Sequence, residues 1–129
     1  MIGREGAAFR SIAGASLPKL PKFAAQHLCN LAYANAIAGC VPKFEDGSTL
    51  FDRIAEKSIP LLGTFQPREL SNLTWSFERA GASNSGLFAK VADRIVSLDR
   101  LGEFKPLELT NILSAFANAG ESNPILFEK

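Results

Sequence analysis

The feature that most constrains the fold of this chain is an internal repeat. The segment from Phe65 to Phe88 aligns without a gap on the segment from Phe104 to Phe127, and twelve of the 24 aligned positions are identical. An earlier copy, from Phe23 to Gly39, shares six of its 17 positions with the Phe65 copy. Self-similarity at a fixed period of about 20–50 residues is typical of arrays of stacked supersecondary units. The sequence therefore predicts a repeat architecture rather than one irregular core.

Two series of phenylalanines show that each repeat contains two elements. The first series is Phe23, Phe65 and Phe104, spaced by 42 and 39 residues, and the second is Phe9, Phe51, Phe88 and Phe127, spaced by 42, 37 and 39. Two alternating elements in each period predict an all-α fold, an α-solenoid of helical hairpins with a period of about 39 residues. The predicted units are residues 1–22 (the second helix of an incomplete leading repeat), 23–64 (repeat 1), 65–103 (repeat 2) and 104–129 (a truncated repeat 3).

The apolar pattern inside each copy predicts the helices and their ends. Apolar residues at steps of three and four place one buried stripe on the first helix of each copy, formed by Leu70, Leu73, Phe77 and Ala80 and then by Leu109, Ile112, Phe116 and Ala119. Proline favours the first turn and glycine the end of a helix, so these helices start near Pro67 and Pro106 and stop at Gly39, Gly81 and Gly120. Second helices are expected to begin near Leu50, Leu87 and Leu126, with Leu62-Gly63 and Leu101-Gly102 ending the two complete ones. A further second helix is expected over residues 9–20, ended early by Pro18 and Pro21.

Composition excludes several classes of function. The 129 residues carry 14 Lys+Arg and 13 Asp+Glu, a formal net charge of +1, so no strong field attracts the chain to nucleic acid or to a membrane. No apolar run approaches the roughly 20 residues of a membrane-spanning helix. A single histidine and two cysteines without metal-ligand spacing disfavour metal and triad chemistry. We therefore expect a protein that is not an enzyme, with no cofactor, no metal, no membrane partner and no small-molecule substrate.

The repeat phrase carries a family resemblance. Read as F-x-P-x-E-L-x-N-L-x-W-x-F-x-x-A-G, at Phe65, Pro67, Glu69, Leu70, Asn72, Leu73, Trp75, Phe77, Ala80 and Gly81, it resembles the octotricopeptide repeat. It is also similar to the leucine-rich region of the FAST kinase-like proteins that end in a RAP domain. This resemblance implies an α-solenoid that binds single-stranded RNA in a mitochondrion or chloroplast and acts in RNA stability, processing or translation. The copies depart from the phrase, since Trp75 is replaced by Ser114 and Tyr33, and Phe77 by Asn35.

The face opposite the buried stripe is the candidate RNA-binding surface. On the second copy it comprises Arg68, Ser71, Trp75 and Arg79. The corresponding residues are Leu107, Thr110, Ser114 and Asn118 on the next copy, and Gln26, Cys29, Tyr33 and Ile37 on the first. These positions vary between copies whereas the stripe recurs, as expected of a scaffold that presents a variable face to successive bases. Trp75 and Tyr33 could stack on a base, and Arg68 and Arg79 could contact phosphate or a base edge.

Structural roles compete with these functional ones. Trp75 could be packed between neighbouring repeats, and the two arginines could be merely solvated. The recurrent asparagines, Asn30, Asn72 and Asn111, are interpreted as structural, each amide bonded to backbone between helices or repeats, and Phe77 and Phe116 as core. His27 is expected at the surface, and Cys29 and Cys40 are expected to be reduced. The alternative to RNA binding is a helical-repeat scaffold for protein–protein interactions.

Overall fold

A computed structural model describes residues 4–82, 84–97 and 104–118, and these residues form an all-helical structure. The six α-helices named in this part of the chain are α1 (Arg4–Ser16), α2 (Ala25–Ala38), α3 (Leu50–Ser58), α4 (Pro67–Arg79), α5 (Ser85–Ser97) and α6 (Pro106–Asn118). Two 3-10 helices, η1 (Leu17–Lys22) and η2 (Ile59–Thr64), follow α1 and α3. The only β-type pairing in the described ranges is an isolated bridge between Lys43 and Thr49. The predicted all-α class is confirmed.

The starts of α2, α4 and α6 use the same local device. The backbone N–H of Gln66 donates to Glu69 Oε1 at 2.8 Å, and that of Lys105 donates to Glu108 Oε1, also at 2.8 Å. In α2 the imidazole of His27 takes the role of the glutamate, because its Nδ1 accepts from the N–H of Ala24 at 3.1 Å. Each bond satisfies a backbone donor that the start of a helix leaves without a partner.

The ends of α2 and α4 also follow the repeat. Gly39 and Gly81 have φ angles of 68° and 67°, the left-handed conformation that glycine adopts at little cost. The chain then turns back, and the N–H groups of Cys40 and Ala82 donate to the carbonyls of Asn35 and Phe77, both at 2.9 Å. The predicted helix stops at these two glycines are confirmed, and Gly120 lies outside the described residues.

Prolines shape the ends of the second helices. The predicted helix over residues 9–20 is instead an α-helix from Arg4 to Ser16 that continues as the 3-10 helix η1, which contains Pro18 and Pro21. In the same way, α3 ends at Ser58. The rest of the segment predicted to run to Leu62-Gly63 is the 3-10 helix η2, which has Pro60 in its first turn. A proline removes an N–H donor and clashes with the preceding turn, so the α-helical hydrogen-bonding pattern stops before it. The predicted stop at Leu101-Gly102 lies outside the described residues.

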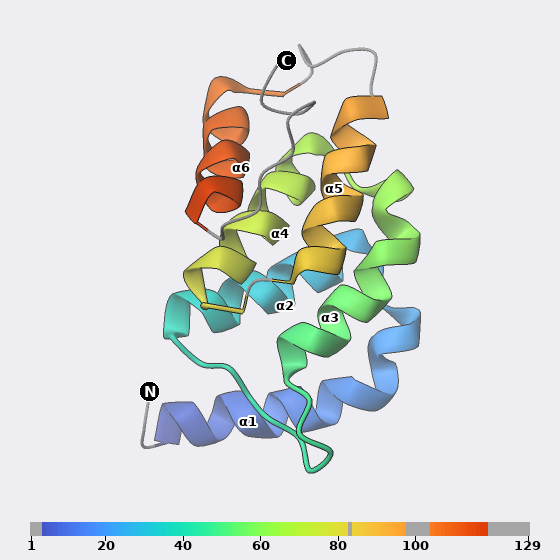
Figure 1. The fold of residues 1–129 in the computed structure, drawn as a ribbon. Helices are drawn as coiled ribbons and strands as arrows, with labels where there is room; N and C mark the ends of the chain where they lie inside the picture. Colours follow the sequence, from blue (N-terminus) through green and yellow to red (C-terminus); the bar gives the residue numbers. More distant parts are fainter. Residues whose placement is uncertain (1–3, 83, 98–103, 119–129) are drawn as a thin grey trace.

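The helices follow one another along the molecule. Figure 1 shows α1 across the bottom and α5 and α6 at the top, with α2, α3 and α4 between them. Helix α4 packs against both α2 and α6, which are its most extensive contacts, while α5 packs against η2 and α3. The first helices of the three copies therefore lie side by side in chain order, with α4 in the middle.

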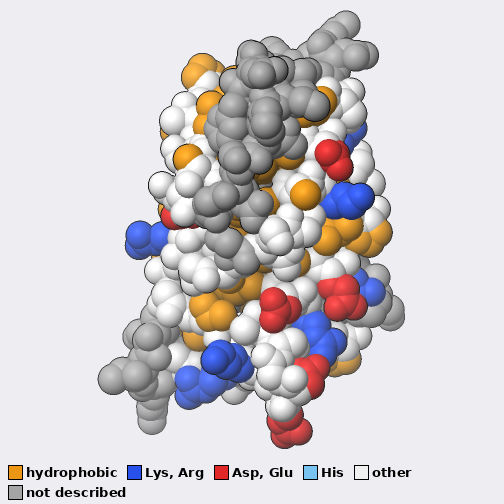
Figure 2. All heavy atoms as spheres, in the orientation of Figure 1, with side chains coloured by type: hydrophobic (Ala, Val, Ile, Leu, Met, Phe, Trp, Pro, Cys, Tyr) orange, Lys and Arg blue, Asp and Glu red, His pale blue; other side chains and the backbone are white. Residues whose placement is uncertain are grey.

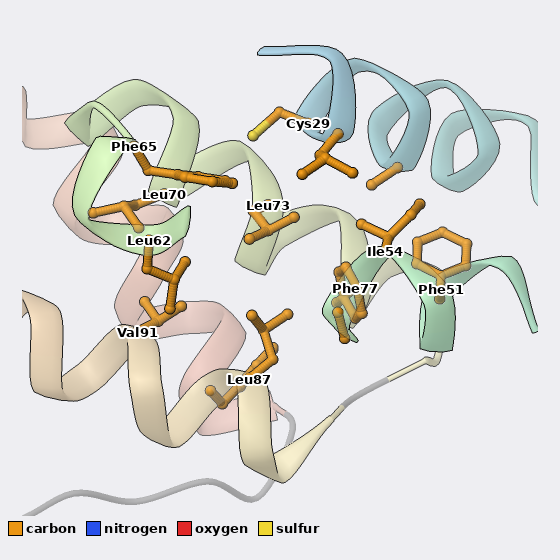
Figure 3. Packing of buried hydrophobic residues seen from close by; sticks show 14 of the residues in the cluster. Cys29, Phe51, Ile54, Leu62, Phe65, Leu70, Leu73, Phe77, Leu87 and Val91 are labelled. Carbon is orange, nitrogen blue, oxygen red and sulfur yellow. The ribbon is translucent and has the colours of Figure 1, made fainter. Parts of the chain in front are cut away.

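In the core, α3 meets α4 and α5 meets α6, each a second helix with the first helix of the following copy. Phe51 of α3 and Phe77 of α4 meet edge to face with ring centroids 5.0 Å apart, and Phe88 of α5 and Phe116 of α6 stack at 5.1 Å. Figure 3 shows Phe77 beside Phe51, with Leu73 and Leu70 further along the same face of α4. These four phenylalanines are at most 1% exposed. The predicted core roles of Phe77 and Phe116 agree with this burial.

Candidate functional site

The outer sides of α2, α4 and α6 carry most of the residues predicted to contact RNA. Arg68 and Arg79 of α4 are exposed, as are three residues of α6, Thr110, Ser114 and Asn118. Tyr33 of α2 is 45% exposed. Since α4 lies between α2 and α6, these side chains lie on three helices that are neighbours in space.

Ser71 is the exception, because its side chain is buried. It is 1% exposed, and its equivalent in α2, Cys29, is 2% exposed, whereas the equivalent Thr110 of α6 is exposed. A helix with neighbours on two sides buries a wider arc than one apolar stripe, and position 71 lies about 100° around the helix from Leu70. The inclusion of Ser71 in the exposed face was therefore wrong. Periodicity within one helix does not reveal how many neighbours cover it.

Asn72, rather than Ser71, lies on the outer side of α4. Together with Arg68, Trp75 and Arg79 it forms a stripe at steps of four, three and four residues, and all four side chains are at least partly exposed. The equivalent residues are Gln26, Asn30, Tyr33 and Ile37 on α2, and Leu107, Asn111, Ser114 and Asn118 on α6. We call these twelve residues the repeat face. Gln26 and Ile37, placed on this face by their equivalence to Arg68 and Arg79, are both exposed.

The recurrent asparagines do not have the bonding role expected of them. Asn30 is exposed and Asn72 and Asn111 are half-buried, all three on the repeat face. Among the described residues none of the three side-chain amides makes a hydrogen bond. The expectation that they bond to backbone between helices or repeats was therefore wrong, and these amides are free to meet a ligand.

Two aromatic side chains meet across the gap between α2 and α4. The rings of Tyr33 and Trp75 have centroids 5.6 Å apart and planes inclined by 35°. Trp75 is half-buried and packs in part against the hydrophobic core. Both roles considered for Trp75 are compatible with its position, since it packs in part against the core and is also partly exposed next to the exposed Tyr33.

A small polar pocket lies between α2 and α4. It has a volume of about 270 Å³ and is lined by Gln26, Cys29, Asn30, Arg68, Glu69 and Asn72. The thiol of Cys29 donates to the backbone carbonyl of Glu69 at 3.3 Å. Burial, helped by the charge of Glu69, raises the pKa of Cys29 to about 12, so this thiol is protonated and unreactive near neutral pH.

A larger apolar groove runs along the other side of α2. It has a volume of about 670 Å³ and is lined by Ser16, Lys19, Phe23, His27, Asn30, Leu31 and Ala34. Leu31 is only half-buried here, whereas its equivalents Leu73 and Ile112 are 0% and 2% exposed. The groove therefore lies beside a residue of α2 whose equivalents in α4 and α6 are buried.

Charge on the surface is mixed. On the face shown in Figure 2, Lys and Arg side chains are interspersed with Asp and Glu, and apolar side chains lie between them. One ion pair links Arg53 to Asp46, whose pKa is lowered to about 2, first by hydrogen bonds from Ser48 and then by Arg53. Cys29 and Cys40 are both free and buried, and His27 is exposed as expected.

Among the described residues, no group of three or more His, Cys, Asp or Glu side chains is placed to hold a metal ion, and none of the described helices is long and apolar enough to cross a bilayer. Comparison of the chain with protein-family models, with curated proteins and with solved structures found no match. A functional assignment therefore depends on the repeat face and its chemistry.

Proposed function

We propose that this chain is a non-enzymatic helical-repeat segment that binds single-stranded RNA on the repeat face. In this proposal α2 with α3, α4 with α5, and α6 are successive units of an α-solenoid with a period of about 39 residues. The resemblance of the repeat phrase to octotricopeptide and FAST kinase-like proteins supports a role in RNA processing, stability or translation in a mitochondrion or chloroplast.

The observation that carries the proposal is the aromatic pair between two arginines. Tyr33 and Trp75 lie together at the junction of α2 and α4. On α4 the exposed Arg68 lies about two turns before Trp75, and the exposed Arg79 lies about one turn after it. Aromatic rings stack on bases of any sequence, and guanidinium groups pair with the phosphates that link those bases. Proteins that bind single strands commonly combine both kinds of contact.

The single tryptophan makes the test direct. Binding of short single-stranded RNA should quench the fluorescence of Trp75, which is the only tryptophan in the chain. Trp75→Ala should weaken RNA binding about 5- to 150-fold, because base–aromatic stacking is worth about 1–3 kcal/mol. Lys90→Ala, which removes an exposed cation from α5, is the control and should leave the affinity unchanged.

Salt dependence gives a second, quantitative test. If Arg68 and Arg79 each neutralise one phosphate, log K should fall against log salt with a slope of about −1.4. A slope near zero would show that no phosphate is contacted. A slope several times steeper would indicate nonspecific attraction to other cations of the surface.

The apolar groove beside α2 favours a second function, a scaffold for protein–protein interactions. Its volume of about 670 Å³ and its half-buried side chains Phe23 and Leu31 suit the apolar side of a partner helix. Absence of RNA binding at low salt would favour this alternative over RNA binding.

A further inference from the structure

The three copies share one polar residue whose recurrence the fold does not explain. Five positions are identical in all three copies, those of Phe65, Leu70, Asn72, Ala80 and Gly81 in the second. Phe65 and Leu70 are buried, Ala80 packs against the core and Gly81 has a positive φ angle, so four of the five have a role in folding. Asparagine is a mediocre helix former, so propensity does not favour it in the middle of a helix.

The remaining residue lies on the surface proposed to bind RNA. Asn30, Asn72 and Asn111, which we call the asparagine row, occupy the same position on three neighbouring helices. Asn30 and Asn72 line the same pocket between α2 and α4. Their amides have no hydrogen-bond partner among the described residues. Each amide therefore offers two donor hydrogens and an acceptor oxygen to a ligand.

A constant residue on a repeating surface fits a constant part of a repeating ligand. In RNA the bases vary from one nucleotide to the next, while the ribose and the phosphate do not. The charges that line the pocket indicate which of the two, ribose or phosphate, the amides would bind. Arg68, which is exposed, is the lining residue proposed above to pair with a phosphate. The other lining residues are Glu69, which is negative, and neutral side chains, so nothing else beside the asparagine amides attracts an anion. A ribose hydroxyl is neutral and is both donor and acceptor, as the amide is.

We propose that the asparagine row binds the 2′-hydroxyl groups of successive riboses and thereby selects RNA over DNA. This inference rests on the proposed RNA-binding function. The asparagines would read the sugar at every copy, while the variable positions, such as those of Tyr33, Trp75 and Ser114, would meet the bases.

The first experiment needs no variant. The affinity of the protein is measured by fluorescence anisotropy for labelled single-stranded RNA, for the 2′-deoxy strand of the same sequence with uracil retained, and for the 2′-O-methyl strand. We expect RNA to bind about fivefold more tightly than DNA for each asparagine that engages a hydroxyl, the ratio for one neutral hydrogen bond of about 1 kcal/mol. The 2′-O-methyl strand, which lacks the donor hydrogen, should also bind less tightly than RNA.

The second experiment removes the amides. Asn30→Ala/Asn72→Ala and the triple variant with Asn111→Ala should lose affinity for RNA in steps, while their affinity for DNA stays the same. Their melting temperatures should be unchanged or higher, because alanine is the best helix former and no internal hydrogen bond is lost. Lys90→Ala on α5 serves as the control and should keep the ratio of RNA to DNA affinity of the unmodified protein.

The outcomes separate this inference from the function on which it depends. Equal affinity for RNA and DNA, or variants that keep the RNA preference, would overturn the role of the asparagine row and leave nucleic-acid binding in place. A lower melting temperature with an unchanged preference would show that the asparagines are structural. Failure to bind either strand would overturn the proposed function itself.

Discussion

Asn35 occupies in the first copy the position that a phenylalanine fills in the other two. It is 3% exposed, and its Nδ2 donates to the carbonyl of Leu31 at 2.8 Å, but its Oδ1 is buried without a hydrogen-bond partner among the described residues. Phe77 and Phe116 at the equivalent positions pair with Phe51 and Phe88. The first copy therefore has a polar group where the others have a paired ring.

Replacing Asn35 should stabilise the protein. Asn35→Leu removes the Oδ1 acceptor, which is buried away from water without a partner, and adds apolar contact. The hydrogen bond to the carbonyl of Leu31 is also lost, and this offsets part of the gain. We expect the free energy of unfolding to rise by about 1 kcal/mol in chemical denaturation. A fall of similar size would mean that the amide has a partner or a role that its surroundings do not show.

The thiol of Cys29 predicts how stability changes at alkaline pH. Its pKa is raised in the folded protein from 9.0 to about 12 by burial and by Glu69. Between these values the unfolded chain loses the thiol proton while the folded protein keeps it, so the free energy of unfolding falls as pH rises. In Cys29→Ala this contribution is absent, and its unfolding free energy should decline less steeply from pH 9 to 11. Equal slopes for the two proteins would contradict the burial of this thiol.

At the scale of the helix, Phe77 tests the assignment of the buried stripe. Its ring is 0% exposed and meets Phe51 across the α3–α4 contact. Phe77→Ala should lower the free energy of unfolding by about 3–5 kcal/mol, as truncation of a buried aromatic residue leaves a cavity. Leu107→Ala, at a position 70% exposed, is the matched control and should change it by less than about 0.5 kcal/mol. An unchanged unfolding curve for Phe77→Ala would place the stripe on the wrong side of α4.

Two glycines in different helical positions should respond to alanine in opposite directions. Gly81, with φ at 67°, follows the last turn of α4, whereas Gly14 lies within α1, and a Cβ atom at either would meet nothing within 4 Å. Gly81→Ala should therefore destabilise by about 1 kcal/mol through backbone strain alone, and Gly14→Ala should stabilise by about 0.5–1 kcal/mol. Melting temperatures measured side by side check both. Destabilisation by both variants would contradict the left-handed helix end.

The sequence predicted those features of the helices that depend on neighbours in the chain. The steps between Leu70, Leu73 and Phe77 identified the buried face, and Glu69 and Gly81 marked the two ends of α4. What it could not predict depends on the number and placement of neighbouring helices. Ser71 is buried by such a neighbour, and Asn72 is left on the outer side, although both lie at helical steps from Arg68. Local periodicity does not distinguish these two positions.

At the scale of the whole molecule, the repeat explains why neighbouring copies carry related surfaces. Helix α4 contacts α2 on one side and α6 on the other. Equivalent residues therefore recur in order along the three helices, as Asn30, Asn72 and Asn111 do. The near-zero net charge is compatible with RNA binding only if the contacts are local, from Arg68 and Arg79, rather than from a general basic surface.

The most direct test of this account is to locate the bound RNA by NMR. Backbone amide spectra of the labelled protein are recorded while single-stranded RNA is added, and the shifted residues are mapped onto the helices. We expect the shifts to follow the repeat face on α2, α4 and α6, centred on Tyr33 and Trp75, with the exposed side of α5 unaffected. Shifts confined to α3 and α5, or to the groove beside α2, would contradict the claim that the first helices of the repeats bind RNA.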